Sequence, residues 1–440
     1  MTQLAAVTIL ALTVGLSLSR PRLGRLSIDH AAAAVLGTLL CMAFGLLEIA
    51  NIVPYFTIIA PAVVTIICLM AITFIAEQSG LFDTMARQIA AAAKGDARKL
   101  FLYIFALGSL TGTVFTNDAA VLIFTPLVFH LVEEIECDNW TRSNKLPFYF
   151  AVLYVANVAG ALVISNPINL IVAQILNISF IDYAKWMVAP ALGSIIASYV
   201  GIRWFFRKSI PERFRELPPQ VVPPHRRTAM LTCAVVLGIT LLALFSSEVT
   251  HVPIWVVAIF AAGALLVLHR KINPHSNYET VAKGIGWDVI IFVIGMFLIV
   301  RSVQAQFWSD TLAAGLSDFL RDRHDGMIYG VSFVAGACSA LFNNHPVADV
   351  VGLTLANLDL PQFQKKMFAF AALIGGDLGP KMLPIGSLAA LMWFRMLRQR
   401  GVHVSYWQYI KIGVSVTLIA IMVSLLVLNA EIAIARFYDW

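Results

Sequence analysis

The sequence predicts an all-α, polytopic membrane protein made of two inverted repeats, each with a re-entrant helical hairpin and a broken transmembrane helix. Three observations predict this fold class. The 440 residues are 59% hydrophobic and only 13% charged, whereas soluble domains carry about 25% charged residues. Most apolar runs approach the ~20-residue length that crosses a bilayer. The same order of apolar runs and polar interruptions also occurs twice along the chain.

This composition excludes a water-soluble enzyme, a disordered protein and a disulfide scaffold. The five cysteines have no C-x-x-C spacing, so the sequence offers no zinc or redox site. No nucleophile–base–metal set is visible, and we expect neither a catalytic residue nor a cofactor. The net charge of +6 is read as a signal of membrane orientation, with no nucleic-acid partner. Because basic residues follow the first apolar run and do not precede it, we expect no cleavable signal.

The membrane-spanning segments follow from the apolar runs of about bilayer length. In the first half they lie at about 4–18, 31–50, 53–77, 147–176 and 184–206. In the second half they lie at about 228–246, 253–269, 285–303, 366–393 and 408–430. Amphipathic stretches at about 79–97 and 304–322 occupy matching places in the two halves.

Two further apolar stretches, at about 100–133 and 327–358, are cut near the middle by polar residues. Unpaired backbone is not tolerated against lipid, so each interruption requires a cavity lined by protein. We therefore predict hairpins that enter the membrane, turn at the polar cluster and leave on the same side.

The basic residues give the orientation. With re-entrant hairpins, 23 of the 31 Lys and Arg residues fall in loops on one side, which the positive-inside rule makes the cytoplasmic side. The predicted domains are a first repeat at 1–206, a cytoplasmic linker at 207–227 and a second repeat at 228–440. Inverted repeats with broken helices are typical of secondary transporters, whose substrate binds near the membrane midplane.

The first hairpin tip contains Thr116, Asn117 and Asp118. An aspartate at the centre of a membrane helix costs about 2.5–3.5 kcal/mol on insertion scales, and is therefore rarely without a function. We expect Thr116 and Asn117 to bind substrate and Asp118 to carry a proton. Capping of the second hairpin helix is the structural alternative for Asp118.

The first broken span carries Ser165, Asn166, Pro167 and Asn169. Proline removes a backbone donor, while Ser and Asn side chains can bond the carbonyl groups that it leaves free. We expect Ser165, Asn166 and Asn169 to bind substrate. A structural kink is the alternative interpretation.

The second broken span is the most specific signal, because glycines, prolines, Asp377, Lys381 and Ser387 lie within one apolar run. We expect Ser387 to bind substrate, and Asp377 and Lys381 to form an internal ion pair that responds to protonation. A purely structural pair is the alternative.

The second hairpin tip adds Asn343, Asn344, His345 and, one turn later, Asp349. We expect both asparagines to bind substrate, and His345 and Asp349 to take part in proton coupling. A histidine that only fills space, and an Asp349 that caps its helix, are the alternatives. Asn, Ser and backbone amides favour a small neutral polyhydroxy solute over a dianion.

These motifs resemble the ArsB-type arsenite efflux permeases of the ion transporter superfamily. The resemblance is carried by T-N-D-A-A at 116–120, S-N-x-x-N at 165–169, N-N-x-P at 343–346 and, most specifically, G-D-L-G-P-K-x-x-P-I-G-S-L-A at 376–389. It implies a multi-pass protein of the bacterial inner membrane that exchanges neutral arsenite or antimonite trihydroxide for protons. It leaves open a soluble ArsA-type ATPase partner and a homodimer. His345, Asp349 and Pro167 depart from the usual family pattern.

Two alternatives remain on the same scaffold. A sodium–proton antiporter would use carbonyl groups at the two breaks with Asp118 and Asp349. A small-anion transporter is the other, although the hairpin tips lack the Ser-Asn-Thr pair that dicarboxylate carriers show.

Overall fold

The computed structural model describes residues 2–19, 21–23, 26–115, 117–135, 140–156, 160–217, 223–272, 278–307, 310–322, 324–386 and 388–437. The elements of the first half are α1 (Thr2–Ser19), β1 (Arg22–Leu23), β2 (Leu26–Ser27), α2 (His30–Ala43), α3 (Ile49–Gln78), α4 (Leu81–Ala92), α5 (Ala97–Val114), α6 (Asn117–Glu134), α7 (Arg142–Ala156), the 3-10 turn η1 (Val163–Ser165), α8 (Pro167–Leu176) and α9 (Phe180–Phe205). The strands β1 and β2 form a small antiparallel pair of two residues each.

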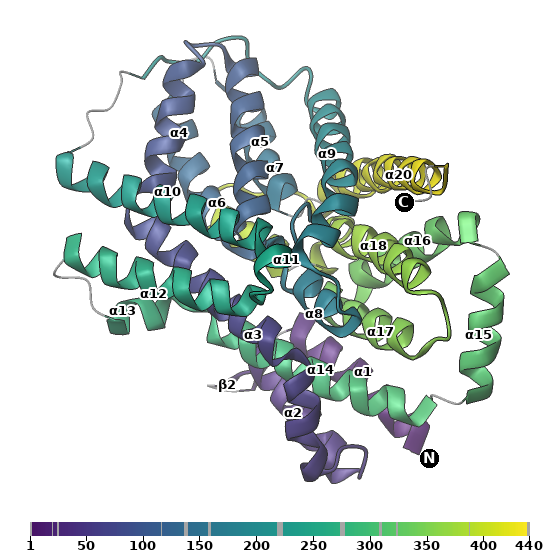
Figure 1. Cartoon of the computed structure of the whole chain (residues 1–440). Coiled ribbons are helices and arrows are strands. Elements are labelled where there is room, and N and C mark those ends of the chain that lie inside the picture. The colour runs from purple at the N-terminus through teal and green to yellow at the C-terminus, as the bar shows by residue number, and fades with distance from the viewer. Residues whose placement is uncertain are drawn as a thin grey trace.

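The second half of the chain, coloured teal to yellow in Figure 1, follows a similar order with two additional short helices. Its elements are α10 (Pro224–Phe245), α11 (Ser247–Thr250), α12 (Ile254–Ile272), α13 (Tyr278–Gly284), α14 (Trp287–Phe307), α15 (Asp310–Asp322), α16 (His324–Phe342), α17 (Asn344–Asn357), α18 (Gln362–Leu378), the 3-10 turns η2 (Gly379–Lys381) and η3 (Pro384–Gly386), α19 (Leu388–Gln399) and α20 (Tyr406–Phe437). Among the described residues, seven helices (α1, α3, α9, α10, α12, α14 and α20) are long and apolar enough to cross a membrane. The predicted all-α, polytopic fold is confirmed.

The main helices of the two halves correspond in order, whereas the short helices α11 and α13 and the β1–β2 pair have no counterpart among the described residues. Each half has a hairpin (α5–α6 and α16–α17) followed by a broken helix (α7–α8 and α18–α19). The packing between the halves is reciprocal. Helix α3 packs against α12 while α14 packs against α2, and α8 packs against α17 while α19 packs against α6. The last helices of the halves, α9 and α20, pack against each other, so the contacts obey an approximate two-fold relation.

The first hairpin begins and ends at the same face of the protein, because both of its ends bond to the segment after α9. Close to the start of α5, the Ala97 amide donates to the Glu212 carbonyl at 3.2 Å and the Phe214 amide to the Gly95 carbonyl at 3.0 Å. At the end of α6, the Arg215 amide donates to the Ile135 carbonyl at 2.9 Å. These bonds join three loops that are predicted to lie on the cytoplasmic side: the loop before α5, the loop after α6 and the segment after α9.

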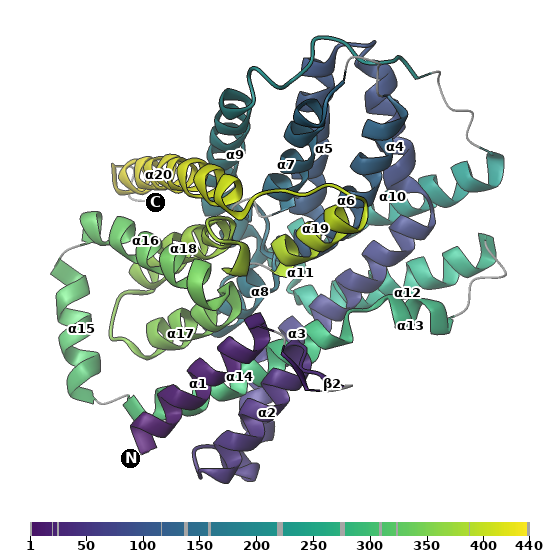
Figure 2. The ribbon, with the colours of Figure 1, turned by 180° about the vertical axis from the view of Figure 1, so that it is seen from behind.

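The second hairpin likewise begins and ends at one face, opposite to the first. The Arg321 guanidinium, near the start of α16, donates to the Asp359 carbonyl at 2.6 Å, just beyond the end of α17. The same face joins the repeats, since the Gln362 amide donates to the Leu176 carbonyl at 3.0 Å and Lys366 forms an ion pair with Asp182. Figure 2 shows α15 at the edge of the molecule, beside α16 and α17.

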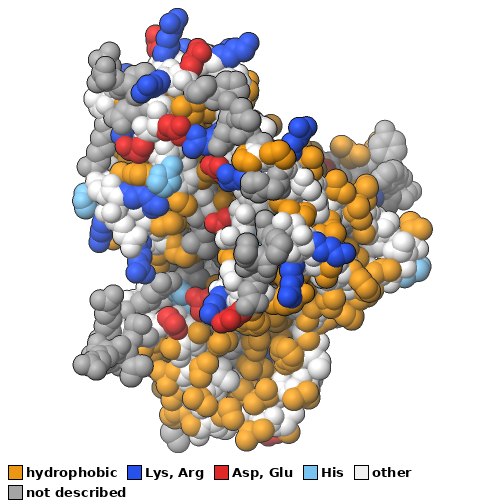
Figure 3. Space-filling view, turned by 90° about the vertical axis from the view of Figure 1, so that its left-hand side faces the viewer, with side chains coloured by type: hydrophobic (Ala, Val, Ile, Leu, Met, Phe, Trp, Pro, Cys, Tyr) orange, Lys and Arg blue, Asp and Glu red, His pale blue; other side chains and the backbone are white. Residues whose placement is uncertain are grey.

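The distribution of basic and apolar side chains on the surface agrees with the predicted orientation in the membrane. In the view of Figure 3, Lys and Arg side chains gather over the upper part of the molecule and apolar side chains cover the lower part. Helix α10 exposes an apolar stripe at Leu231, Val235, Ile239 and Leu242. Such a stripe faces lipid in a membrane and needs no protein partner.

Helix boundaries differ from the predicted spans at two places, where a glycine with positive φ or a proline at the start of a helix sets the boundary. The predicted span at 31–50 is two elements, because α2 ends at Ala43 and Gly45 adopts φ +67° before α3 begins. The first broken helix is interrupted earlier than expected, since α7 ends at Ala156 and α8 begins only at Pro167. Proline suits that first helical position, because its missing N–H would have no helical partner there.

Candidate functional site

The two broken helices bring Asp377 into contact with the first break. Asp377 lies near the C-terminal end of α18, is 0% exposed, and faces Asn166 and Asn169 of the first repeat. The Asn166 amide donates to Asp377 Oδ1 at 2.5 Å, and the Asn169 amide donates to Oδ2 at 3.2 Å. The backbone N–H of Gly160 donates to the same Oδ2 at 2.9 Å. We call Asp377 and these three donors the Asp377 cage.

The negative charge of the Asp377 carboxylate makes the loss of any of these hydrogen bonds costly in free energy. Hydrogen bonds to an ionised acceptor are roughly twice as strong as neutral ones, and a carboxylate away from water needs them to offset its desolvation. Asn166 has a second function, because its side-chain oxygen accepts from the Ile168 amide as the N-cap of α8. One residue therefore both starts α8 and holds the carboxylate of the other repeat.

Lys381 is buried four residues after Asp377, but it bonds elsewhere. Its ammonium donates to the Tyr154 carbonyl at 3.1 Å and lies 5.1 Å from the centre of the Tyr154 ring. Asp377 and Lys381 therefore form no direct salt bridge, although their charges interact across a longer distance. The 3-10 turn η2 begins at Gly379, so the spacing of four residues no longer places the two side chains together as it would in an α-helix.

Three residues of the cage region were not found from the sequence: Gly160, Tyr154 and Tyr183. A Cβ at Gly160 would overlap the Asn169 and Ser165 side chains, so only glycine fits there. The glycine within the first break was the available signal. Tyr183 donates to the Gly160 carbonyl at 3.2 Å, and neither it nor the Tyr154 carbonyl carries a sequence motif.

The glycines of the second break have mainly a packing function. A Cβ at Gly375 or Gly379 would overlap the backbone of α16 at Ser332 or Gly336, and one at Gly386 would overlap Ala340. The sequence pattern predicts that the four glycines of this span mark a functional break. In the structure, three of them allow α18 and the turns after it to approach α16 closely.

The second hairpin tip does not bond to the Asp377 cage through any contact among the described residues. Asn343 adopts φ +74° and caps α17 by accepting from the His345 amide at 3.2 Å. Asn344 is half-buried, and the His345 ring packs edge-on against Phe292 of α14. Asp349 does not cap the helix, because Asn343 occupies that position.

Several buried polar atoms have no hydrogen-bond partner among the described residues. They include Asn169 Oδ1, the hydroxyls of Ser332 and Ser339 on α16, His345 Nδ1 and both carboxylate oxygens of Asp349. Ser339 lies beside Gly376, next to the cage. Unsatisfied buried polar atoms are rare in folded proteins and are candidates for ligand contact.

Other predicted residues are placed only in part. Ser165 lies in η1 and donates to the Leu162 carbonyl at 2.7 Å. Asn117 and Asp118 begin α6, but their side chains lie outside the described residues, as do Thr116 and Ser387 altogether.

Comparison with known proteins matches almost the whole chain. Residues 5–431 match the family model described as arsenical pump membrane protein. Two Escherichia coli proteins named arsenical pump membrane protein are 29% and 30% identical over 437 and 438 residues, covering 98% of this chain and 99% of each relative. A Yersinia enterocolitica protein of the same name is 28% identical, again over 98% of this chain and 99% of the relative. The crystal structure of the YdaH transporter from Alcanivorax borkumensis has a similar fold, with a TM-score of 0.58 at 14% identity, covering 99% of this chain and 98% of that one.

Proposed function

This chain belongs to the arsenical pump membrane protein family, and we propose that it exports arsenite and antimonite as neutral trihydroxides in exchange for protons. The family is one of membrane transporters, and the chain is therefore an arsenical efflux transporter with several spans, as expected of a bacterial inner-membrane protein. The proposal concerns the chemical form of the substrate, the coupling ion and the residues that bind them.

The observation that supports the proposal most directly is the Asp377 cage at the junction of the repeats. A trihydroxide is a small solute with three O–H groups, each of which donates and accepts a hydrogen bond. The cage supplies a carboxylate acceptor, and Asn169 Oδ1 and the Ser339 hydroxyl have no other partner among the described residues. A donated solute hydroxyl can replace one of the amide donors on Asp377 without leaving its charge bare.

The same carboxylate offers a mechanism for exchange. A proton on Asp377 and a solute hydroxyl donated to it compete for the same lone pairs, so each weakens the binding of the other. Coupling requires only that the two ligands favour different states of the transporter. Lys381, held on the Tyr154 carbonyl, provides the positive charge that lowers the cost of keeping Asp377 ionised inside the membrane.

Asp349 is a second acid with a different environment. Neither of its carboxylate oxygens has a donor among the described residues, and the side chain is 1% exposed. An ionised carboxylate in such a place is costly, so we propose that Asp349 is the neutral member of the pair and a station for the transported proton. The ArsA-type ATPase and the homodimer remain predictions.

The test uses everted membrane vesicles with an acidified lumen and a pH-sensitive dye. Arsenite or antimonite added to the medium should enter the vesicles and release protons, and the Asp377→Asn variant should lose this response. The matched control is Asp288→Asn, which changes an exposed aspartate in the first turn of α14. A wild type without arsenite-dependent proton movement, and without resistance in a sensitive host, would refute the proposal. A response to sodium alone would instead support the sodium–proton alternative.

A further inference from the structure

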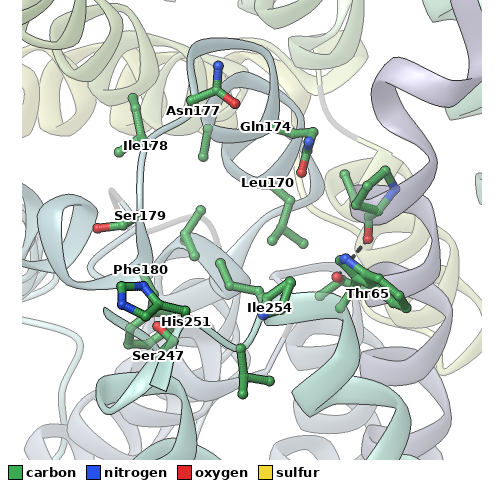
Figure 4. A pocket seen from close by; sticks show the side chains of 17 residues that line it. Thr65, Leu170, Gln174, Asn177, Ile178, Ser179, Phe180, Ser247, His251 and Ile254 are labelled. Carbon is green, nitrogen blue, oxygen red and sulfur yellow. Dashed lines mark hydrogen bonds between the residues drawn. The ribbon is translucent and has the colours of Figure 1, made fainter. Parts of the chain in front are cut away.

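A cavity of about 590 Å³ lies beside the first break, between helices of both repeats (Figure 4). Helices α3 and α8 and the start of α9 form the walls from the first repeat. Residues of α11 and the start of α12 form the wall from the second repeat, where Ser247 and His251 lie across from Asn177. The cavity is therefore built at a contact between the repeats.

The cavity extends from the surface to about the middle of the membrane. Thr65, one of its lining residues, lies ~24 Å from the start and ~20 Å from the end of α3 at a rise of 1.5 Å per residue. At the other end, the lining residues Asn177 and His251 are exposed. A solute that entered here could reach the depth of the broken helices.

One face of α8 leads from the cavity to the Asp377 cage. The lining residues Leu170, Ala173, Gln174 and Asn177 follow the spacing of a single helical face. Asn166, which holds Asp377, lies one turn before Leu170 on that face, ~6 Å along the helix axis. Val163, another lining residue, lies three positions before Asn166 in the turn η1.

The cavity is closed at its inner end. Val163 is 0% exposed and Leu170 is 4% exposed, and these two lining residues flank Asn166 of the cage in the sequence. The open end is on the face opposite the basic loops, since it lies beside Leu176, which accepts from Gln362, and Asp182, which pairs with Lys366. That face is the outer one in the predicted orientation.

Six of the 17 lining residues have hydroxyl, amide or imidazole side chains, the others are apolar, and none of the 17 is acidic, lysine or arginine. The hydroxyls of Thr65 and Ser247 and the amides of Gln174 and Asn177 can bond hydroxyl groups without a net charge. By contrast, a second cavity of about 650 Å³ between α1 and the α16–α17 hairpin has a lining that is almost entirely aliphatic and aromatic, as expected for lipid chains. A mixed lining of apolar residues with a few uncharged polar groups suits a small neutral solute with hydroxyl groups.

We propose that this cavity is the outer vestibule through which the neutral trihydroxide leaves the protein, and that Val163 and Leu170 form the closed gate between the vestibule and the Asp377 cage. The proposal rests on the proposed function for its solute. The location of the vestibule rests on the geometry, and its outward access rests on the geometry together with the orientation predicted from the basic residues.

The test places single cysteines on the two walls, with Gln174→Cys on α8 and Ser247→Cys on α11. Each variant is exposed to a membrane-impermeant, negatively charged thiosulfonate reagent, added outside spheroplasts or to everted vesicles. Val249→Cys is the matched control, since Val249 lies on the same short helix as Ser247, is 82% exposed and does not line the cavity. The wild type, treated alike, gives the background from the native cysteines.

We expect both vestibule cysteines to be modified from outside and not from the cytoplasmic side, with loss of arsenite efflux. The Val249→Cys variant should be modified without loss of efflux. The proposal is overturned if the two wall positions are not modified from outside, or if their modification leaves efflux unchanged. If the wild type moves no arsenite, the proposed function fails, while the side from which each cysteine is modified still decides whether the vestibule opens outward.

Discussion

The bond between Asn166 and Asp377 can be tested by exchanging the two side chains. In N166D the cap of α8 is retained, because Asp and Asn are similar N-caps, but the amide donor to Asp377 is replaced by a second carboxylate. D377N removes the charge from α18. The double variant places an amide and a carboxylate opposite each other again, with the donor now on the second repeat.

The expected magnitude follows from the contact. The bond is 2.5 Å long, joins a charged acceptor to an amide, and lies where Asn166 is 3% and Asp377 0% exposed. Bonds to charged groups contribute about 1.5–3 kcal/mol. We therefore expect the double variant to be more stable than the sum of the single changes predicts by about 1.5–3 kcal/mol, within the usual range for residues in contact.

The assay is thermal unfolding in detergent for the wild type, the single variants and the double variant, with arsenite efflux measured in parallel. N357D combined with D377N is the control, because the Asn357 amide bonds only to Leu353 of its own helix among the described residues. The control pair should be additive. A coupling below about 0.5 kcal/mol for N166D with D377N would refute a stabilising bond between the repeats.

Three further predictions concern packing, capping and surface charge. Gly375→Ala should destabilise the protein by about 1–3 kcal/mol, because the new Cβ overlaps the α16 backbone, whereas Gly238→Ala has open space and should not; equal unfolding midpoints for the two variants would contradict this. Asp96 caps α5, and the backbone amide of Lys99, followed by that of Arg98, lowers the pKa of its carboxyl group. The stabilisation by this carboxylate should be complete above the ordinary pKa and disappear as the pH falls through the lowered one, so Asp96→Asn should show a weaker loss of stability in acid, and a curve parallel to that of the wild type would exclude it. Arg226→Ala removes a half-exposed ion pair of 3.2 Å with Asp83 and should lower the free energy of unfolding by no more than about 1 kcal/mol. The loss should shrink at high salt, and unfolding measured at low and high salt would check this.

The hydropathy of the sequence determined the all-α, polytopic fold, because the length and polarity of each segment are local properties that a membrane selects directly. The duplicated order of spans, hairpin and broken helix was visible for the same reason. The sequence also showed that polar residues gather at the breaks, and in the structure Asn166 and Asn169 bond to Asp377.

The sequence could not show which of these polar groups meet. Substrate binding by Asn343 stays a prediction, and the structure adds that Asn343 adopts a positive φ and caps α17. Asp377 and Lys381 were expected to pair, but a 3-10 turn separates them. The glycines near Asp377 were expected to mark a functional break, but three of them are required by the close approach of α16.

Hydropathy thus decided how often the chain crosses the bilayer and where it is interrupted, since both depend on neighbouring residues. Only the tertiary structure decided that Asn166 of one repeat holds Asp377 of the other, 211 residues away. It also decided that a cavity lies beside α8, with the lining residue Leu170 one helical turn after Asn166. Such contacts depend on how the two halves pack, because backbone groups freed at a break find their partners wherever packing places a donor or an acceptor.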